Sequence, residues 1–392
     1  MQKLYETQEK PKKAFLVSVI NGELSDEPRA GELRGLCETL GLEIIAHEKI
    51  KVRQRSPKFG IGSGKAEELA QKAGELKDDL IVVDWNSPKD SKKKFQEFTS
   101  PSQQRNWESL SGIPFLDRQE LIIRIFADRA NTKEAELQVK LAELSYFLPR
   151  LTHKYIDLSQ QRGGRYGSKG KGETKLETDR RTIEKRINQL EKEIEQVSKQ
   201  RQMQRRQRQR TNIPVCAIVG YTNSGKSSLL NALTSAGVLA ENKLFATLDA
   251  VTRRFQPAPG VQVLLTDTVG FIRELPHSLI KAFRSTLEEA ALADILIHIL
   301  DASENDIENN YETTLSVLSE LGAEQLPMIT VLNKIDRLPV SKEQIADADI
   351  VTVEELQNRF PESIAVSAKT GMGLDLLKAR IVLETGKIEN PH

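Results

Sequence analysis

Residues 220–227 limit the possible folds of this chain more than any other segment. An apolar run over 214–219 precedes them, as in a buried strand, and residues 228–233 continue as a helix. In such a strand–loop–helix unit, glycines let backbone N–H groups turn inward around phosphate oxygens, and the helix adds the positive end of its dipole. A phosphate-binding loop is therefore expected, formed by Gly220, Tyr221, Thr222, Asn223, Ser224, Gly225, Lys226 and Ser227.

Two side chains of this loop are expected to contact a nucleoside triphosphate. Lys226 would reach the β- and γ-phosphates as a catalytic group, and Ser227 would offer its hydroxyl to Mg²⁺. The alternative is a glycine-rich turn that binds nothing, which the flanking strand and helix disfavour.

A second apolar strand, over 261–266, is followed by Asp267, Thr268, Val269 and Gly270. A carboxylate at the end of a neighbouring strand can hold Mg²⁺ through water, and the Gly270 N–H can approach the γ-phosphate. This segment is therefore expected to respond to the nucleotide, with Gly270 as a second candidate catalytic group.

Two further apolar strands, over 329–332 and 363–366, are each followed by residues suited to a base. These residues are Asn333, Lys334 and Asp336, and then Ser367, Ala368 and Lys369. The four motifs, in this order, resemble those of a translation-factor-type GTPase, which implies guanine and hence GTP as substrate. The chemistry agrees, because the Asp336 carboxylate can accept from both N1–H and the exocyclic amine of guanine, a donor pair that adenine lacks.

Residues 239–254 are expected to form the first switch segment, called switch I below, between the helix after the phosphate loop and the next strand. A threonine hydroxyl from such a segment usually closes the Mg²⁺ shell when the γ-phosphate is present. Thr247 and Thr252 both qualify by chemistry, and either could instead be a loop threonine that is satisfied locally.

Residues 1–116 predict a small α/β domain with a mainly parallel sheet. Strands are expected over 15–20, 43–46, 80–84 and 113–116, and helices over 29–40, 65–76 and 103–110. Within this domain residues 60–65 imitate a phosphate loop, but Ala66 follows Lys65, so no hydroxyl is placed for Mg²⁺. We interpret the run as a turn that opens the next helix, with an anion site for RNA phosphate as the alternative.

Residues 117–210 predict a long antiparallel helical hairpin, and residues 211–392 the P-loop domain. The hairpin seam is indicated by apolar residues recurring every three or four positions: Leu137, Leu141, Leu144 and Leu148, then Ile183, Ile187, Leu190, Ile194 and Val197. Pro149 should end the first helix, and a glycine-rich basic loop over 162–172 should join the two helices at their tip. Residues 199–210 are too polar to bury and should form a solvated helix or linker.

The tip and the second helix are strongly basic, although the whole chain has a net charge of only +1. Residues 162–210 contain sixteen Lys and Arg against seven Asp and Glu. Basic side chains attract phosphates and an aromatic ring can stack on an unpaired base, which suits structured RNA. The candidates for RNA contact are Arg162, Arg165, Tyr166, Lys169 and Lys171, with an ordinary solvated loop as the alternative.

Several segments resemble the signature segments of HflX-type GTPases. They read Leu-Asp-Arg over 116–118, Ile-Phe-Ala-Asp-Arg-Ala over 125–130, Glu-Ala-Glu-Leu-Gln-Val over 134–139, Leu-Pro-Arg-Leu over 148–151 and Leu-Glu-Thr-Asp-Arg-Arg over 176–181. A further segment consists of Phe245, Ala246, Thr247, Leu248 and Asp249. Its resemblance to the family selects Thr247 as the catalytic and metal-binding threonine and adds the segment to the nucleotide site.

With that segment, the resemblance covers nearly the whole chain. It implies a ribosome-binding GTPase that acts on the large ribosomal subunit and its RNA and separates stalled or idle ribosomes. Two departures bear on this expectation. Lys-Gly-Lys-Gly-Glu over 169–173 stands where the family's tip usually reads Arg-Gly-Pro-Gly-Glu, and only a short tail follows the helix expected over 374–383, so the extra C-terminal domain of some members is expected to be absent.

Phe271 follows Gly270, where many GTPases place a glutamine that orients the attacking water. A phenyl ring cannot orient water by a hydrogen bond, so unaided hydrolysis should be slow and the ribosome is the economical source of the missing stabilisation. Asn223 offers another source, because asparagine at this position resembles GTPases that use K⁺ beside the β- and γ-phosphates. Alternatively, Asn223 caps the loop through local hydrogen bonds.

Two other functions fit part of the sequence. An RNA-binding factor in ribosome assembly or stress would use nucleotide only to regulate binding, but Lys226, Ser227 and Asp267 provide an Mg²⁺ shell that a scaffold would not need. A tRNA-modification GTPase of the same superfamily predicts a second catalytic domain, and neither the N-terminal domain nor the hairpin offers an obvious catalytic cysteine or cofactor fingerprint.

The remaining features predict a cytoplasmic protein. Cys37 and Cys216 are too few for a disulfide framework, the first thirteen residues lack the apolar core of a signal peptide, and no eighteen apolar residues run together. The five histidines form no cluster with metal-ligand spacing. We expect a monomer without membrane insertion.

Overall fold

The structure is a computed structural model, which describes residues 12–20, 26–52, 56–85, 99–161, 169–209, 213–234, 237, 241, 243–273, 279, 283–339 and 351–389. Within its helices, the side chains at 26, 152–161, 169–176, 201–202, 204–209 and 284–286 lie outside this description. The chain divides into two compact units, Met1–Asp128 with Lys140–Leu190, and Arg129–Val139 with Glu191–His392. The expected α/β class, with a parallel N-terminal sheet, a helical region and a P-loop domain, is confirmed.

The first unit contains a four-stranded parallel sheet in the order β2-β1-β3-β4. Its elements are β1 (Lys13–Ile20), α1 (Asp26–Thr39), β2 (Glu43–Lys51), α2 (Ser63–Glu75), β3 (Leu80–Trp85), α3 (Pro101–Ser111) and β4 (Phe115–Asp117). β1 and β3 are almost wholly buried, as expected of central parallel strands. Gly62 caps α2 and Lys65 pairs with Glu68 at 2.6 Å, so the glycine-rich run over 60–65 opens a helix.

A cluster of buried charges joins three elements of this unit. Asp84 at the end of β3 accepts hydrogen bonds from Arg29 of α1 (2.8 Å) and from Arg118 (3.2 Å), the first residue of α4 (Arg118–Arg129). Arg118 also pairs with Glu32 of α1. Burial by itself raises the pKa of the Asp84 carboxyl, but the two guanidinium groups hold it below its ordinary value. Arg118, in the signature segment over 116–118, therefore has a structural role here.

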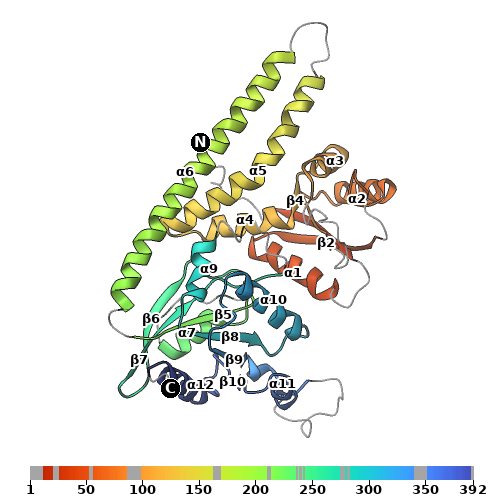
Figure 1. Ribbon diagram of the computed structural model, residues 1–392. Helices are drawn as coiled ribbons and strands as arrows, with labels where there is room; N and C mark the ends of the chain where they lie inside the picture. The colour runs from red at the N-terminus through yellow and green to blue at the C-terminus, as the bar shows by residue number, and fades with distance from the viewer. Residues whose placement is uncertain are drawn as a thin grey trace. The chain divides into compact units, whose positions relative to one another are not determined.

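The helical region consists of α5 (Lys133–Gln161) and α6 (Lys169–Gln209), which run in opposite directions in Figure 1. The predicted seam of α6 is less exposed than its neighbours: Leu190 is fully buried, and Ile183 and Ile187 are half-buried. This pattern agrees with the periodicity of the sequence.

Two predicted boundaries in this region are wrong. α5 continues through Pro149 to Gln161. The next residue, Arg150, donates to the Tyr146 carbonyl oxygen (2.9 Å) and to Asp117 (3.0 Å), and these contacts help to fix this turn of the helix. α6 begins at Lys169, so the stretch over 169–172 is helical rather than part of the loop. A glycine within a helix costs only about 1 kcal/mol, which a long packed helix can offset.

The second unit contains a six-stranded sheet in the order β10-β9-β8-β5-β7-β6, in which β6 pairs antiparallel with β7 and the other recorded pairings are parallel. The strands are β5 (Val215–Gly220), β6 (Val251–Ala258), β7 (Val261–Asp267), β8 (Ile295–Asp301), β9 (Met328–Asn333) and β10 (Ile364–Ala365). The helices are α7 (Lys226–Thr234), α9 (Arg284–Ala291), α10 (Ile307–Glu320), α11 (Val353–Arg359) and α12 (Leu374–Glu389). The expected switch I extends too far: its last four residues, 251–254, belong to β6, because they pair with β7.

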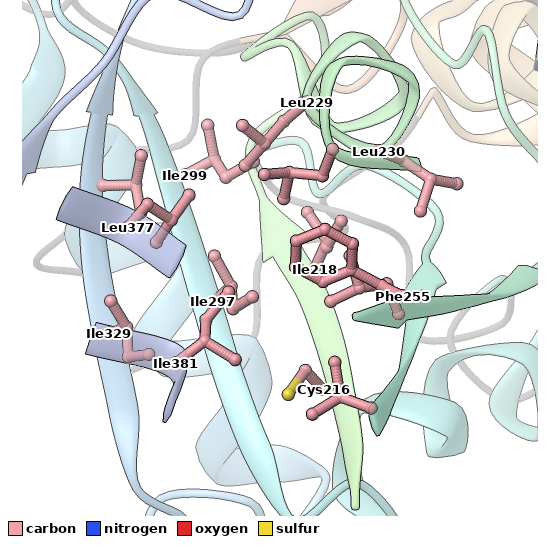
Figure 2. Close-up of a cluster of buried hydrophobic side chains, with 14 of the residues drawn as sticks. Cys216, Ile218, Leu229, Leu230, Phe255, Ile297, Ile299, Ile329, Leu377 and Ile381 are labelled. Carbon is pink, nitrogen blue, oxygen red and sulfur yellow. The ribbon is translucent and has the colours of Figure 1, made fainter. Parts of the chain in front are cut away.

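Helices α7 and α12 pack on one face of this sheet. Figure 2 shows Leu229 of α7 near Ile299 of β8, and Ile381 of α12 near Ile297 and Ile329. On the other face His298 of β8 stacks on Tyr311 of α10, with ring centroids 5.1 Å apart. Among the residues that the structure describes, no helix is long and apolar enough to cross a membrane.

Candidate functional site

The predicted nucleotide motifs meet at one edge of the second sheet. β5, β7, β8 and β9 are parallel, so their carboxyl ends share this edge, where they present Gly220, Asp267, Asp301 and Asn333. β7 and β8 lie on either side of β5, which places the loop after β5 where open α/β sheets bind ligands. A cavity of about 420 Å³ lies there, lined by residues of all four motifs.

The phosphate loop is held by the residues expected to bind the base. Gly225 has a φ of +97°, and an added Cβ would lie 2.2 Å from Asn333 Nδ2, so only glycine allows this approach. Asn333 Nδ2 donates to the Ser224 carbonyl oxygen (2.9 Å), and Lys334 Nζ donates to the Asn223 carbonyl oxygen (2.8 Å). Phosphate and base recognition therefore share one hydrogen-bond network.

Lys226 is buried beside the end of β7. Its Nζ donates to the Tyr221 carbonyl oxygen at 2.8 Å, and burial lowers the pKa of the ammonium to about 8 despite the charge of Asp267. A Cβ on Gly270 would lie 2.9 Å from this Nζ and 2.8 Å from Thr222 Cα, so a side chain at position 270 would collide with the phosphate loop. A phosphate in the cavity would supply the negative charge that favours the protonated lysine.

Three oxygen-bearing side chains come together where Ser227 and Thr247 line the cavity. Ser227 Oγ lies 2.6 Å from Asp267 Oδ2, and Thr247 Oγ1 lies 2.8 Å from Ser227 Oγ and 3.1 Å from Asp267 Oδ2. Asp267 Oδ1 is buried and has no hydrogen-bond partner among the described residues, and burial raises the pKa of this carboxyl. Two hydroxyls and a buried carboxylate are hard oxygen donors that could hold Mg²⁺, whose charge would offset that of Asp267.

The two candidate threonines of switch I are separated by the structure. Thr247 reaches Ser227 and Asp267, whereas Thr252 lies in β6 and hydrogen-bonds Thr266 Oγ1 at 3.0 Å. In the sequence, only family resemblance favours Thr247 over Thr252. The structure adds a physical reason, because the Thr252 hydroxyl is paired with Thr266 within the sheet.

Phe271 is packed into the protein interior. Its N–H donates to the Gly220 carbonyl oxygen (3.1 Å), its own carbonyl accepts from the Thr222 N–H (2.7 Å), and the residue is 1% exposed. The ring is not part of the cavity lining. The structure thus agrees with the inference that this position cannot orient a water molecule.

Hydrogen bonds hold in place the residues that are expected to bind the base. Asp336 Oδ1 accepts from Ser367 Oγ (2.6 Å), and Asn333 Oδ1 accepts from the Ala368 N–H (3.0 Å). Asp301, which the sequence analysis missed, pairs with Lys334 at 2.6 Å. Its signal was the apolar run over 295–300 ending in an acid, the same pattern that identified Asp267.

Apart from Asp249, the residues predicted for the nucleotide site divide into two sets. Those lining the cavity are Thr222, Asn223, Gly225, Lys226, Ser227, Phe245, Ala246, Thr247, Gly270, Asn333, Lys334, Asp336, Ala368 and Lys369. Those buried away from its lining are Gly220, Tyr221, Ser224, Leu248, Asp267, Thr268, Val269 and Ser367. Asp249 instead hydrogen-bonds Thr132 Oγ1 at 2.5 Å, and Ser228, Glu241, Lys243 and Arg337 line the cavity without having been predicted.

The candidates for RNA contact cannot be placed. Arg162, Arg165 and Tyr166 lie outside the described residues, and Lys169 and Lys171 belong to α6 without described side chains. Their role stays a prediction.

Comparisons with known proteins cover most of the chain. Three family models match consecutive parts: "GTP-binding GTPase N-terminal" over 27–127, "GTP-binding GTPase Middle Region" over 129–208 and "50S ribosome-binding GTPase" over 215–334. Relatives named "GTPase HflX" include that of Akkermansia muciniphila, 42% identical over 98% of this chain and 87% of the relative. That of Caldanaerobacter subterraneus is 43% identical over 96% and 81%, and that of Escherichia coli is 37% identical over 93% and 80%.

Among solved structures, a GTP-binding protein from the hyperthermophilic archaeon Sulfolobus solfataricus in complex with GDP is similar to this chain. The two are 26% identical, with 96% of this chain and 99% of the other covered, and the TM-score is 0.47.

Proposed function

Because this chain belongs to the HflX family of GTPases and is a GTP hydrolase, we propose that it binds the large ribosomal subunit and uses the GTP cycle to dissociate stalled or idle ribosomes. The observation that supports the ribosome as partner is the match of residues 215–334 to the "50S ribosome-binding GTPase" model, and the GTP cycle is supported by one cavity that gathers groups suited to phosphates, to Mg²⁺ and to guanine. In the GTP state the protein binds large-subunit RNA, and GTP hydrolysis releases the protein from the RNA. It acts as a monomer in the cytoplasm.

Each part of the site has an assigned role in this proposal. Lys226 and the Gly270 N–H bind the γ-phosphate, and the Asp336 carboxylate selects guanine. Ser227, Thr247 and Asp267 hold Mg²⁺, which supplies positive charge beside the phosphates when bound. The N-terminal domain (1–116) and the hairpin (117–210) carry the contacts with RNA, and the P-loop domain (211–392) carries the switch.

Asp336→Asn should shift base preference from guanine toward xanthine. The amide keeps one acceptor but turns a donor toward guanine's donor pair, which costs about 1–3 kcal/mol, or roughly 5- to 150-fold in affinity. Competition of GTP and XTP against a fluorescent nucleotide measures the change. Asp375→Asn, whose parent carboxylate is 95% exposed on α12, is the matched control. Unchanged GTP affinity in Asp336→Asn would overturn the role of Asp336.

We further propose that K⁺ binds at Asn223 and assists hydrolysis. Asn223 lines the cavity, and its backbone φ is +59°. A cation there would offset charge that develops during phosphoryl transfer, the task that an arginine finger performs elsewhere. Steady-state hydrolysis should be faster in KCl than in NaCl at equal ionic strength, and Asn223→Ala should remove the difference. A parent enzyme indifferent to the cation, both alone and with ribosomes, would leave the ribosome as the source of the missing group.

The hairpin tip should supply much of the affinity for the large subunit. Neutralising Arg162, Arg165, Lys169 and Lys171 together should weaken co-sedimentation with large subunits, because each lost phosphate contact removes roughly one unit of the log–log salt slope. GTP binding should be retained. The matched control neutralises four basic residues farther along α6, namely Arg180, Arg181, Lys185 and Arg186.

Equal losses in both quadruple variants would show that general charge, and not the tip, attracts RNA. A parental affinity and salt slope in the tip variant would show that the loop is only a connector.

A further inference from the structure

Two contacts in the second unit link switch I to Arg129, the last residue of α4, and to Thr132, the residue before α5. Arg129 Nη2 donates to Glu241 Oε2 at 2.9 Å, and Thr132 Oγ1 donates to Asp249 Oδ1 at 2.5 Å. None of the nucleotide motifs accounts for these contacts. We call the four residues, Arg129, Thr132, Glu241 and Asp249, the switch I clamp.

The Arg129 contact is more protected than an ordinary surface pair. The Arg129 side chain is 15% exposed and that of Glu241 is 31% exposed. Hydrogen bonds between ionised groups are about twice as strong as neutral ones, and partial burial reduces their screening by salt. The pair can therefore restrain the segment that carries Glu241.

The Thr132 contact starts from a fixed point on a helix. Thr132 Oγ1 accepts from the Ala135 N–H (3.2 Å), and its carbonyl oxygen accepts from the Glu136 N–H (2.9 Å), so Thr132 caps the N-terminus of α5. Its hydroxyl proton remains for Asp249. The position of Asp249 is thereby tied to the first turn of α5.

The clamp holds switch I on both sides of the residues that face the nucleotide site. Glu241 lies before Phe245 and Thr247, and Asp249 lies two residues after Thr247. Glu241 itself lines the cavity, while Phe245 is 2% exposed with a φ of +53°, an unusual backbone angle for a bulky residue. The two contacts thus restrain the chain before and after Thr247, whose hydroxyl lies 2.8 Å from Ser227 Oγ.

We propose that Arg129 and Thr132 are positioning residues for Thr247: through Glu241 and Asp249 they hold its hydroxyl at the Mg²⁺ site. This inference rests on the proposed role of Thr247 in the GTP state.

The test compares affinities for a non-hydrolysable GTP analogue and for GDP. Because we propose that Thr247 binds Mg²⁺ together with the γ-phosphate, which GDP lacks, loss of positioning should weaken analogue binding roughly tenfold while GDP affinity stays within about twofold. A purely structural role would move both affinities together or neither. The Mg²⁺ concentration needed for half-maximal hydrolysis should rise in parallel.

The variants separate the clamp from helix capping. Arg129→Gln removes the charged donor, and Thr132→Asp keeps a good N-cap acceptor but repels Asp249. Thr132→Ser keeps both the N-cap acceptor and the hydroxyl donor, so it should retain the parental ratio of affinities. In a Thr247→Ala background the clamp variants should have little further effect, because both changes remove the same interaction.

The outcomes distinguish this inference from the proposed function. If Thr247→Ala itself leaves the ratio of analogue to GDP affinity unchanged, the assigned role of Thr247 fails, and the clamp with it. If Thr247→Ala lowers the ratio but Arg129→Gln and Thr132→Asp do not, the clamp alone is overturned. A decrease of analogue and GDP affinity by the same factor in both clamp variants also overturns it.

Discussion

Replacing Lys226 with alanine is expected to lower the rate of GTP hydrolysis by roughly 100- to 1,000-fold, the range seen when one preorganised transition-state donor is removed. Lys226 is buried, and its Nζ lies where Gly270 meets the phosphate loop. Single-turnover hydrolysis of radiolabelled GTP, with and without ribosomes, measures the loss.

The chain contains its own control for this substitution. Lys65 also follows a glycine-rich run, but its side chain is 40% exposed and pairs with Glu68 at the start of α2. Lys65→Ala should hydrolyse GTP at the parental rate. Parental hydrolysis by Lys226→Ala, or an equal loss in both variants, would contradict the assigned phosphate site.

Asp84→Ala is expected to destabilise the first unit by about 3–5 kcal/mol, because it leaves the Arg29 and Arg118 guanidinium groups buried without this carboxylate. Asp84 is 2% exposed and both arginines are buried. Since the folded pKa of Asp84 lies below its unfolded value, its contribution is complete above the ordinary carboxyl pKa and is lost as the pH falls through the folded one. At neutral pH this contribution is complete, so the substitution should lower the free energy of unfolding of the first unit there.

Tryptophan fluorescence can isolate this effect. The chain has two tryptophans, Trp85 and Trp107, and both are buried in the first unit. Urea unfolding followed by their emission should show a lower midpoint for Asp84→Ala, while nucleotide binding by the second unit is retained at low denaturant. The control Glu68→Ala removes an exposed partner, worth about 0–1 kcal/mol. A parental midpoint for Asp84→Ala would mean that the buried cluster does not stabilise the fold.

The nucleotide site was the most predictable part of the structure. Its residues follow apolar strands, and parallel strands bring their carboxyl ends to one edge, so sequence order indicated that Lys226, Asp267 and Asn333 would meet. Asp301 was missed because the apolar run before it was not identified as a strand, although its pattern is the same. β6 was missed because its residues show no apolar run and include Pro257, and only pairing with β7 makes the segment a strand.

The long-range contacts could not be predicted from local pattern. Glu241 and Asp249 lie more than a hundred residues from Arg129 and Thr132, and nothing in the sequence near either pair indicates the other. Likewise, Pro149 wrongly predicted a helix end. The hydrogen bond from Arg150 to Asp117, which helps to hold the helix, involves a residue in another element, so the local sequence did not indicate it. Tertiary packing, rather than propensity, decided both cases.

Ribosome dissociation itself can be measured by sucrose-gradient sedimentation of intact ribosomes mixed with the protein and GTP, a non-hydrolysable analogue, or GDP. We predict that GTP and the analogue convert intact ribosomes into separate subunits, with the protein on the large subunit in the analogue sample, and that GDP does not. Lys226→Ala should leave ribosomes intact in every sample. Intact ribosomes with the parent protein in all three nucleotide states, whether or not the protein co-sediments with them, would contradict the proposed function.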